Sequence, residues 1–172
     1  SGDADPFVVA AFDAARAQLV LNFVTAPDTA CVELRRVVRP GGVIGATVWE
    51  VKGGMQMLRL FWDAALAVDP AAPDEASTMR FGRPGEIVDL FDGAGLTDID
   101  EQLLTVSSTY RDFDERWATF LTGVGPAGSY CVSLTDDRRA ALRTELSDRL
   151  GNPTGEFGLG ATAVCAIATV PA

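Results

Sequence analysis

Residues 12–49 read FDAARAQLVLNFVTAPDTACVELRRVVRPGGVIGATVW, and this stretch decides the fold. Residues 14–21 predict a short strand, and residues 27–38 predict an amphipathic helix because their apolar positions recur at helical spacing. Pro40 forbids continuation of that helix, and Gly41-Gly42 turns the chain. Residues 43–49 are continuously apolar in character, as expected of a strand covered on both faces. The order strand, helix, strand predicts an α/β fold with parallel neighbouring strands.

The rest of the chain continues this alternation of helices and strands. Apolar periodicity predicts helices over residues 55–68, 84–94, 113–121 and 135–150, and strands within 99–110 and 161–170. A loop rich in Gly and Pro, residues 151–160, joins the last helix to the last strand. No linker divides the chain, so the sequence predicts one domain over residues 1–172.

The composition excludes several classes of function. With 14 basic and 24 acidic residues the net charge is -10, so we expect neither nucleic acid nor an anionic membrane as a partner. The sequence has no histidine, which excludes a Ser-His-Asp or Cys-His nucleophile and a histidine base. Cys31, Cys131 and Cys165 have no metal-ligand spacing, so we expect reduced cytoplasmic thiols and no metal site. No membrane helix and no secretory signal are expected.

Several short motifs resemble one known family. They are Gly2-Asp3-Ala4, Phe12-Asp13-Ala14, the run from Gln18 to Phe23, Leu34-Arg35-Arg36-Val37, and Arg39-Pro40-Gly41-Gly42. Together they resemble the C-terminal part of class I S-adenosylmethionine-dependent methyltransferases, most of all the small-molecule branch labelled type 11. Arg83-Pro84-Gly85 and the run from Phe91 to Leu96 resemble the helix and turn before that family's sixth strand. The resemblance covers essentially the whole chain and is most specific over residues 12–49.

The resemblance implies a Rossmann-like sheet of which this chain holds the last four strands. The final strand is expected to lie antiparallel between the second and the third. The family's first strand with its Gly-rich cofactor loop, and its second strand with the ribose-binding acid, have no counterpart before Ser1. The chain is thus expected to be truncated, a fragment, or completed by another chain. Because the strand at 14–21 would have an unpaired edge, we expect self-association.

The resemblance also implies S-adenosylmethionine as the cofactor and a small molecule as the methyl acceptor. Asp3 matches the family's acidic residue at the adenine amino group, and Ala4 follows it. Ala17 and Gln18 lie where the strand ends, near the crevice in which α/β sheets bind ligands. The family reaction is an in-line displacement that mainly requires alignment of donor and acceptor. Glu50 is the candidate base if the acceptor must lose a proton.

A helical lid is expected from residues 55–79 and 113–134. The residues that could wall an acceptor pocket are Asn22, Phe23, Trp49, Met55, Trp62, Trp117 and Phe120. The alternative for the aromatic residues is ordinary core, since aromatic side chains at helical spacing usually pack inside. Asn22 and Phe23 stand where related sequences often carry a histidine pair.

Two rival functions remain. The pattern Gly123-Val124-Gly125-Pro126-Ala127-Gly128 would suit dinucleotide binding only after a strand, yet helical sequence precedes it and Pro126 removes a donor. We therefore expect a flexible turn there. The other rival is a non-catalytic relic or binding subunit that pairs with another chain and binds no cofactor alone.

Overall fold

The computed structural model describes residues 7–51 and 53–172. These residues form two compact units. Unit 1 comprises the described residues of Ser1–Lys52, with Arg80–Leu104 and Thr162–Ala172, and unit 2 comprises Gly53–Met79 and Thr105–Ala161. Unit 2 contains both segments that we expect to form a lid, and their role as a lid stays a prediction.

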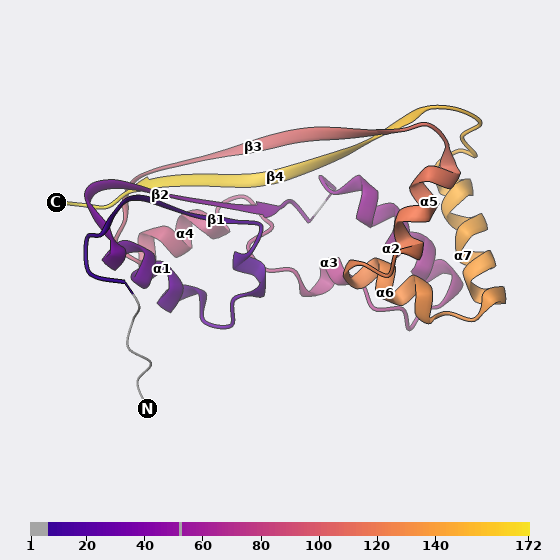
Figure 1. Ribbon diagram of the computed structural model, residues 1–172, viewed down its shortest axis with the longest axis horizontal. Helices are drawn as coiled ribbons and strands as arrows, with labels where there is room; N and C mark the ends of the chain where they lie inside the picture. Colours follow the sequence, from indigo (N-terminus) through magenta and orange to yellow (C-terminus); the bar gives the residue numbers. More distant parts are fainter. Residues whose placement is uncertain (1–6, 52) are drawn as a thin grey trace. The chain divides into compact units, whose positions relative to one another are not determined.

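Four strands form one open sheet in the order β1-β2-β4-β3 (Figure 1). Their bounds are β1 (Phe12–Gln18), β2 (Val38–Trp49), β3 (Thr97–Tyr110) and β4 (Phe157–Thr169). β1 is parallel to β2, and β4 is antiparallel to β2, with Val43 opposite Thr169 and Trp49 opposite Ala163. The predicted α/β class is therefore confirmed, and so is the antiparallel last strand between the second and the third.

The first strand ends three residues earlier than the sequence predicts. β1 stops at Gln18 because Leu19 has a φ of 54°, in the left-handed region that ends an extended run. The Leu19 N–H still donates to the Thr47 carbonyl at 2.8 Å. Leu21–Phe23 then form a short 3₁₀ helix, η1, in which Leu21 is buried. The apolar run of Leu19, Val20 and Leu21 is as compatible with a buried turn as with a strand, which is why the prediction was wrong here.

Gly41 and Gly42 turn the chain, as predicted, but they do so inside β2, which already begins at Val38. The pairing with β1 shifts between Phe12, opposite Val38, and Ala14, opposite Val43. Gly41 adopts a φ of 74°, which favours glycine. Its N–H donates to the Val170 carbonyl at 2.8 Å, and the Val170 N–H donates to the Gly42 carbonyl at 2.9 Å. The glycine pair is thus a bulge whose backbone remains paired.

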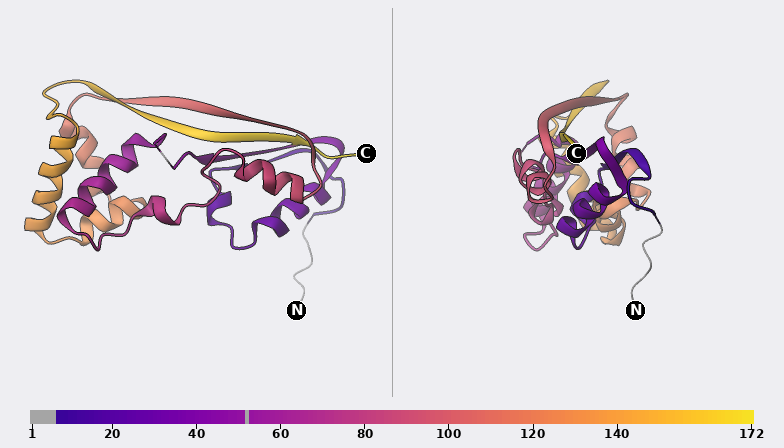
Figure 2. Two further views of the ribbon diagram at one scale, coloured as in Figure 1. Left: turned by 180° about the vertical axis from the view of Figure 1, so that it is seen from behind. Right: turned by 90° about the vertical axis from the view of Figure 1, so that its left-hand side faces the viewer.

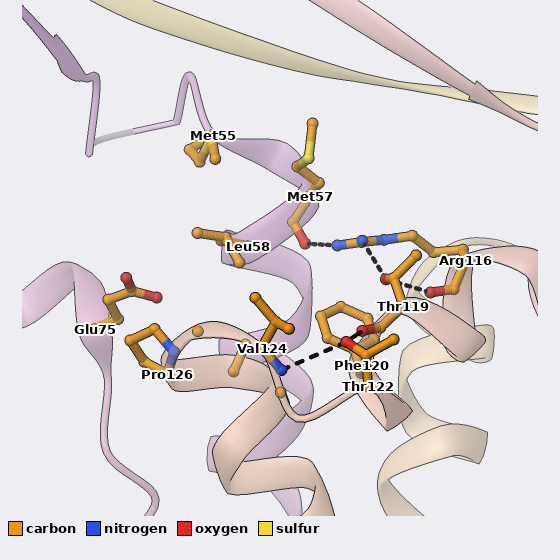
Figure 3. A pocket seen from close by; sticks show the side chains of 13 residues that line it. Met55, Met57, Leu58, Glu75, Arg116, Thr119, Phe120, Thr122, Val124 and Pro126 are labelled. Carbon is orange, nitrogen blue, oxygen red and sulfur yellow. Dashed lines mark hydrogen bonds between the residues drawn. The ribbon is translucent and has the colours of Figure 1, made fainter. Parts of the chain in front are cut away.

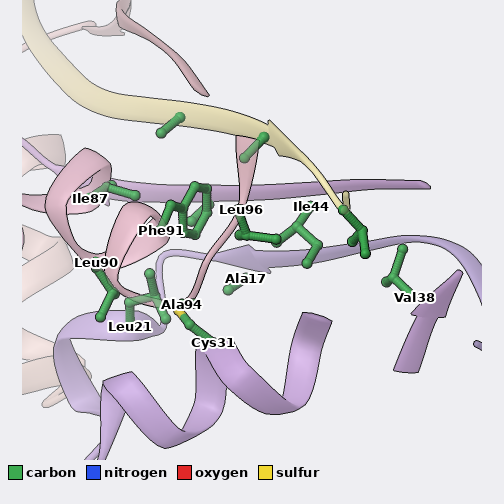
Figure 4. Close-up of a cluster of buried hydrophobic side chains, with 14 of the residues drawn as sticks. Ala17, Leu21, Cys31, Val38, Ile44, Ile87, Leu90, Phe91, Ala94 and Leu96 are labelled. Carbon is green, nitrogen blue, oxygen red and sulfur yellow. The ribbon is translucent and has the colours of Figure 1, made fainter. Parts of the chain in front are cut away.

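In unit 1, helices α1 (Pro27–Val37) and α4 (Glu86–Gly93) lie on the same face of β1 and β2 (Figures 1 and 2). Their apolar side chains join those of the strands in one core, shown in Figure 4, which includes Ala17, Cys31, Ile44, Phe91 and Val164. Burial, and to a lesser extent the neighbouring Asp28, raises the pKa of the Cys31 thiol to about 11. This thiol is therefore a small core side chain and stays protonated at neutral pH.

The face of the sheet in unit 1 that lies away from α1 and α4 is more exposed than the sequence predicts. Ile44, Ala46 and Val48 are buried, but Gly45 and Thr47 between them are only partly covered and Val43 is 44% exposed. The expectation that residues 43–49 are covered on both faces was therefore wrong for the described residues. Glycine and threonine interrupt the apolar pattern at alternate positions, and this alternation marks a strand with one covered face.

Unit 2 is helical apart from parts of β3 and β4. Its helices are α2 (Gln56–Val68), α3 (Glu75–Thr78), α5 (Phe113–Leu121), α6 (Gly125–Ser133) and α7 (Asp136–Arg149). The core is aromatic: Phe61 and Trp62 are fully buried, and the Phe61 ring lies 4.3 Å from that of Phe120. Within the described residues, no helix combines the length and the apolar character that crossing a membrane requires.

The helices predicted from periodicity are present, and α6 is the one longer helix that the sequence did not predict. We expected a flexible turn over residues 123–128, because glycine and proline are typical of turns. The structure starts α6 at Gly125, with Pro126 in its first turn, where its missing N–H costs nothing. Gly128 is buried, and a Cβ there would lie 2.9 Å from the Gly123 carbonyl carbon. These glycines allow close helix packing as well as a turn.

Candidate functional site

The residues expected to hold a cofactor are only partly within the described chain. Asp3 and Ala4 lie outside the described residues. Ala17 and Gln18 are the last two residues of β1, as expected of residues at the carboxyl end of a parallel strand. Ala17 is buried at 9% exposure and Gln18 is exposed.

Ala17 and Gln18 line a pocket of about 190 Å³ on unit 1. The parallel register places Arg16 opposite Gly45, Ala17 opposite Ala46 and Gln18 opposite Thr47. These six residues and Cys165 of β4 form the lining. The sequence analysis missed Arg16 and Thr47. Their alternation with the buried Ala17 and Ala46 is the period-two signal that could have placed them on a face with Gln18.

One polar atom of this pocket has an unmet hydrogen-bonding requirement. Thr47 Oγ1 is buried and has no hydrogen-bond partner among the described residues. Arg16 and Gln18 likewise make no side-chain hydrogen bond or ion pair to any residue of the described chain. Buried polar groups are almost always paired, so the Thr47 hydroxyl is the atom that calls for a polar ligand, and the exposed Arg16 and Gln18 add a guanidinium and an amide beside it.

Four other predicted residues belong to unit 1 but not to this pocket. Asn22 is half-buried and Phe23 is 69% exposed, both in η1. Trp49 is half-buried at the end of β2. Glu50 follows it, and its N–H donates to the Thr162 carbonyl at 2.8 Å. Because β1 and β2 are parallel, Glu50 and Gln18 follow or end strands at the same edge of the sheet.

Unit 2 contains a larger pocket of about 510 Å³, shown in Figure 3. Met55 and Phe120, two of the predicted acceptor residues, line it. Trp62 and Trp117 do not, because they are buried in the core at 1% and 6% exposure. The Trp62 indole N–H donates to Glu75 Oε2 at 3.4 Å, and Glu75 lies on the pocket wall. The remaining lining residues are Met57, Leu58, Arg116, Thr119, Thr122, Val124, Gly125, Pro126, Ala127 and Gly128.

Arg116 of α5 is the buried charged residue of this wall, at 6% exposure. Its guanidinium donates to the Met57 carbonyl at 2.5 Å and to Thr119 Oγ1 at 3.0 Å, and it lies 4.2 Å from the centre of the Phe120 ring. Burial lowers its pKa from the ordinary value, with an opposing contribution from Tyr110. Arg116 could not be predicted from the sequence, because an arginine in an amphipathic helix is usually solvated.

The glycine pattern lies in the same wall. Gly123 and Gly125 have φ values of 72° and 70°, and the segment leads from α5 into α6. A dinucleotide fingerprint needs a strand in front of the glycines, and here a helix stands in that place. The segment therefore lacks the context of a nicotinamide site. Within the described residues, no group of three Cys, Asp or Glu side chains is arranged to hold a metal ion.

Comparisons with known proteins bear on the fold. A family model described as a methyltransferase domain matches residues 1–46. This segment contains β1, α1 and most of β2, and so includes every β1 and β2 residue of the unit 1 pocket except Thr47. None of the curated proteins matches the sequence.

The fold is similar to that of many solved structures, among them three with TM-scores above 0.5. A proposed methyltransferase from Bacillus halodurans is 13% identical with a TM-score of 0.52, and the match covers 98% of this chain and 74% of that one. The YcgJ protein from Bacillus subtilis is 12% identical with a TM-score of 0.54, covering 98% and 68%. A proposed type II methyltransferase from Anaeromyxobacter dehalogenans is 18% identical with a TM-score of 0.57, covering 95% and 66%.

The chain spans about two thirds to three quarters of these three proteins, and 59% and 35% of two further matches. Identities this low show the fold alone. The sheet order agrees with these matches, so the fold that the resemblance to class I methyltransferases implies is confirmed, and the family model supports the resemblance over residues 1–46.

Proposed function

We propose that this chain, which has the methyltransferase fold and a methyltransferase-domain match at its N-terminal end, takes part in S-adenosylmethionine-dependent methyl transfer to a small-molecule acceptor. The observation that carries the proposal is the pocket at the end of β1. It joins the expected residues Ala17 and Gln18 to a buried hydroxyl without a partner among the described residues. The proteins that this chain resembles are longer than the chain. We therefore propose only the contacts with cofactor and acceptor that these residues can make.

The polar side chains of the unit 1 pocket fit the charged methionine end of the cofactor. A guanidinium binds a carboxylate by charge-assisted hydrogen bonds, so Arg16 would hold the methionine carboxylate. Gln18 can accept a hydrogen bond from the amino group, and Thr47 Oγ1 can accept from it or donate to the carboxylate. Asp3, with Ala4 beside it, remains the proposed contact of the adenine amino group.

The chemistry requires little acid or base from the protein. S-adenosylmethionine supplies a methyl group on a positively charged sulfur, which is already an activated leaving group. The residues of the chain would then position the two reactants and exclude water, consistent with a sequence that has no histidine. Glu50 is the proposed base for an acceptor that must lose a proton. The pocket of unit 2, with Met55 and Phe120 in its wall, is the proposed acceptor site.

The affinity of the 172-residue chain for the cofactor is expected to be low. A cofactor of this size needs contacts at its adenine, its ribose and its methionine end. Each missing contact removes roughly 1–3 kcal/mol, and each 1.4 kcal/mol is about tenfold in affinity. The residues identified above supply the methionine end and, through Asp3, the adenine. We expect the loss of several contacts to move a typical micromolar affinity to a dissociation constant of about 1 mM or weaker, and a value near or below about 10 µM would contradict this expectation.

Thr47→Val tests the proposed cofactor site through two effects of opposite sign. Valine has the shape of threonine but removes the buried hydroxyl, so the free protein should gain about 1 kcal/mol of unfolding free energy, or about 2–4 °C in Tm. The same change should weaken binding of S-adenosylhomocysteine about fivefold, because one hydrogen bond is lost. Thermal unfolding and ligand titration of the purified chain measure the two effects.

Thr47→Ser is the matched control, because it keeps the hydroxyl and removes the methyl group. It should bind S-adenosylhomocysteine more tightly than Thr47→Val while unfolding at a lower temperature. The proposal fails if the valine variant binds as tightly as the wild type, since Thr47 Oγ1 would then not meet the ligand.

A second candidate function, partner binding, rests on the outer edge of β1. The strand order leaves that edge unpaired among the described residues, and Val43 and Ile167 are each 44% exposed on β2 and β4. Unpaired edges pair readily with other strands. We propose that a second copy of the chain covers this part of unit 1.

We also propose a cytoplasmic location, because the three cysteines are free thiols.

Self-association is measured by sedimentation equilibrium. The expected result at micromolar concentration is a mass above that of the monomer, and Ile167→Lys should shift the distribution towards monomer because it places a charge on the exposed face. Val132→Lys, a change at an exposed α6 residue of unit 2, is the control and should leave the mass unchanged. A monomer mass for the wild type contradicts the candidate.

A further inference from the structure

The pocket of unit 2 contains a buried cation without a carboxylate partner. Arg116 forms no ion pair with any Asp or Glu of the described residues, although it is only 6% exposed. Its two hydrogen-bond acceptors, the Met57 carbonyl and Thr119 Oγ1, are both neutral, and so are the Tyr110 and Phe120 rings that it lies over. A guanidinium has five N–H donors, so these two bonds leave donors for a further acceptor. A buried charge without a counter-ion is costly, and an anionic ligand would relieve that cost.

A second feature of the same wall also favours an anion. The N-terminus of α6 opens on the pocket, with Val124, Gly125, Pro126, Ala127 and Gly128 all in the lining. Val124 is the N-cap residue, and no side chain caps the helix there. The first N–H groups of a helix and its dipole attract negative charge. Arg116 and this helix end line the same pocket, and both would favour an anionic ligand there.

Apart from Thr119 and Thr122, the rest of the wall is largely apolar, and one acidic side chain makes the two sides of the pocket differ in charge. Met55, Leu58 and Phe120 supply apolar surface, and Glu75 lies on the opposite side of the pocket from Arg116 (Figure 3). A carboxylate at Glu75 repels an anionic group, so the anionic end of a ligand would lie towards Arg116. The apolar part would then extend along the methionine and leucine side chains.

We propose that the pocket of unit 2 binds a small apolar carboxylate, with the carboxylate at Arg116 and the α6 N-terminus. The role of this ligand as a methyl acceptor rests on the proposed function, whereas the binding itself rests on unit 2 alone. Because the carboxylate is held by Arg116, the atom that accepts the methyl group would be another atom of the same molecule.

Three ligands of similar shape test whether the pocket prefers a negative, a neutral or a positive ligand. They are 4-phenylbutyrate, 4-phenylbutanol and 4-phenylbutylamine. Each is titrated into the 172-residue protein, and binding is followed by calorimetry and by the fluorescence of Trp62 and Trp117. The acid should bind about tenfold or more tightly than the alcohol, as one charge-assisted hydrogen bond would give, and the amine should bind most weakly. Equal affinity for acid and alcohol, or a preference for the amine, would overturn the proposal.

Val124→Asp and Val124→Asn form a matched pair of variants. Val124 is 80% exposed, and both residues are good N-caps, so both variants should fold and cap α6. The aspartate adds a negative charge at the pocket, so it should weaken binding of 4-phenylbutyrate by about tenfold relative to the asparagine variant. Equal affinity of the two variants would place the bound acid elsewhere and overturn the proposal.

Arg116→Met removes the cation and should abolish the preference for acid over alcohol if the variant remains folded by circular dichroism. The ligands contain no part of S-adenosylmethionine, so this test is independent of cofactor binding at unit 1. Binding of the acid without binding of S-adenosylhomocysteine would leave this inference standing and refute the proposed function. Binding of S-adenosylhomocysteine without binding of the acid would refute this inference and leave the proposed function standing.

Discussion

Gly42→Ala is expected to destabilise unit 1 by about 3 kcal/mol or more, a large share of the stability of a typical domain. A Cβ at residue 42 would overlap Val38 Cγ1 and would lie 2.6 Å from the Asp13 carbonyl oxygen and 2.9 Å from the Arg39 carbonyl oxygen. Two of these three atoms belong to the backbone of the β1–β2 pair, which cannot move without breaking its hydrogen bonds. Urea unfolding followed by far-ultraviolet circular dichroism measures the loss.

Gly45→Ala is the control, since it adds the same methyl group to the same strand. Its Cβ would lie 3.7 Å from Ile167 Cγ2 and 3.8 Å from the Ala166 carbonyl oxygen, which are ordinary contacts. Its unfolding free energy should stay within about 1 kcal/mol of the wild type. If both variants unfold at the same urea concentration, the bulge at Gly41-Gly42 is not packed as described.

Phe61→Ala is expected to destabilise unit 2 by about 3–5 kcal/mol. Phe61 is fully buried, and its ring contacts three others, with centroids 4.3 Å from Phe120, 5.2 Å from Trp62 and 6.4 Å from Tyr130. Removal of the ring leaves a cavity among side chains that are already fixed by their neighbours. Because Trp62 and Trp117 both lie in this core, tryptophan fluorescence during urea unfolding reports the change.

Leu121→Ala, at a 47% exposed position on α5, is the comparison for Phe61→Ala. An exposed leucine makes few contacts, so this change should cost less than about 1 kcal/mol. A similar loss for both variants would mean that the aromatic cluster does not hold unit 2 together.

The α/β class could be predicted from the alternation of helices and strands. The strand order came from the family resemblance, which implied a last strand antiparallel between the second and the third, and β4 lies there. Helix ends with a strong local signal, such as Pro27 and Gly95, were also predictable. Gly95 has a φ of 72°, and a Cβ there would lie 2.5 Å from Arg35 Nη1.

The parts that could not be predicted depend on tertiary contacts. In the sequence Leu19 looks like one more residue of an apolar run, yet its left-handed backbone conformation ends β1, although its N–H still pairs with Thr47 of β2. The helical pattern around Arg116 is typical of a residue exposed to solvent, yet packing against Phe120 buries its side chain. Trp62 and Trp117 were expected at a pocket, yet burial in the core excludes them from its wall. Hydrophobic periodicity indicates that a side chain faces inward, but not whether it meets a cavity or a neighbour.

Chemical-shift mapping of S-adenosylhomocysteine binding is the most direct test of the proposed function. The ¹⁵N-labelled 172-residue protein is titrated to several times the expected dissociation constant of about 1 mM, and the shift of every backbone amide is followed. We expect saturable shifts concentrated at residues 16–18 and 45–47, with smaller shifts for Thr47→Val at the same ligand concentration. Shifts confined to unit 2, or none at residues 16–18 and 45–47, would contradict the assignment of the β1 pocket to the cofactor.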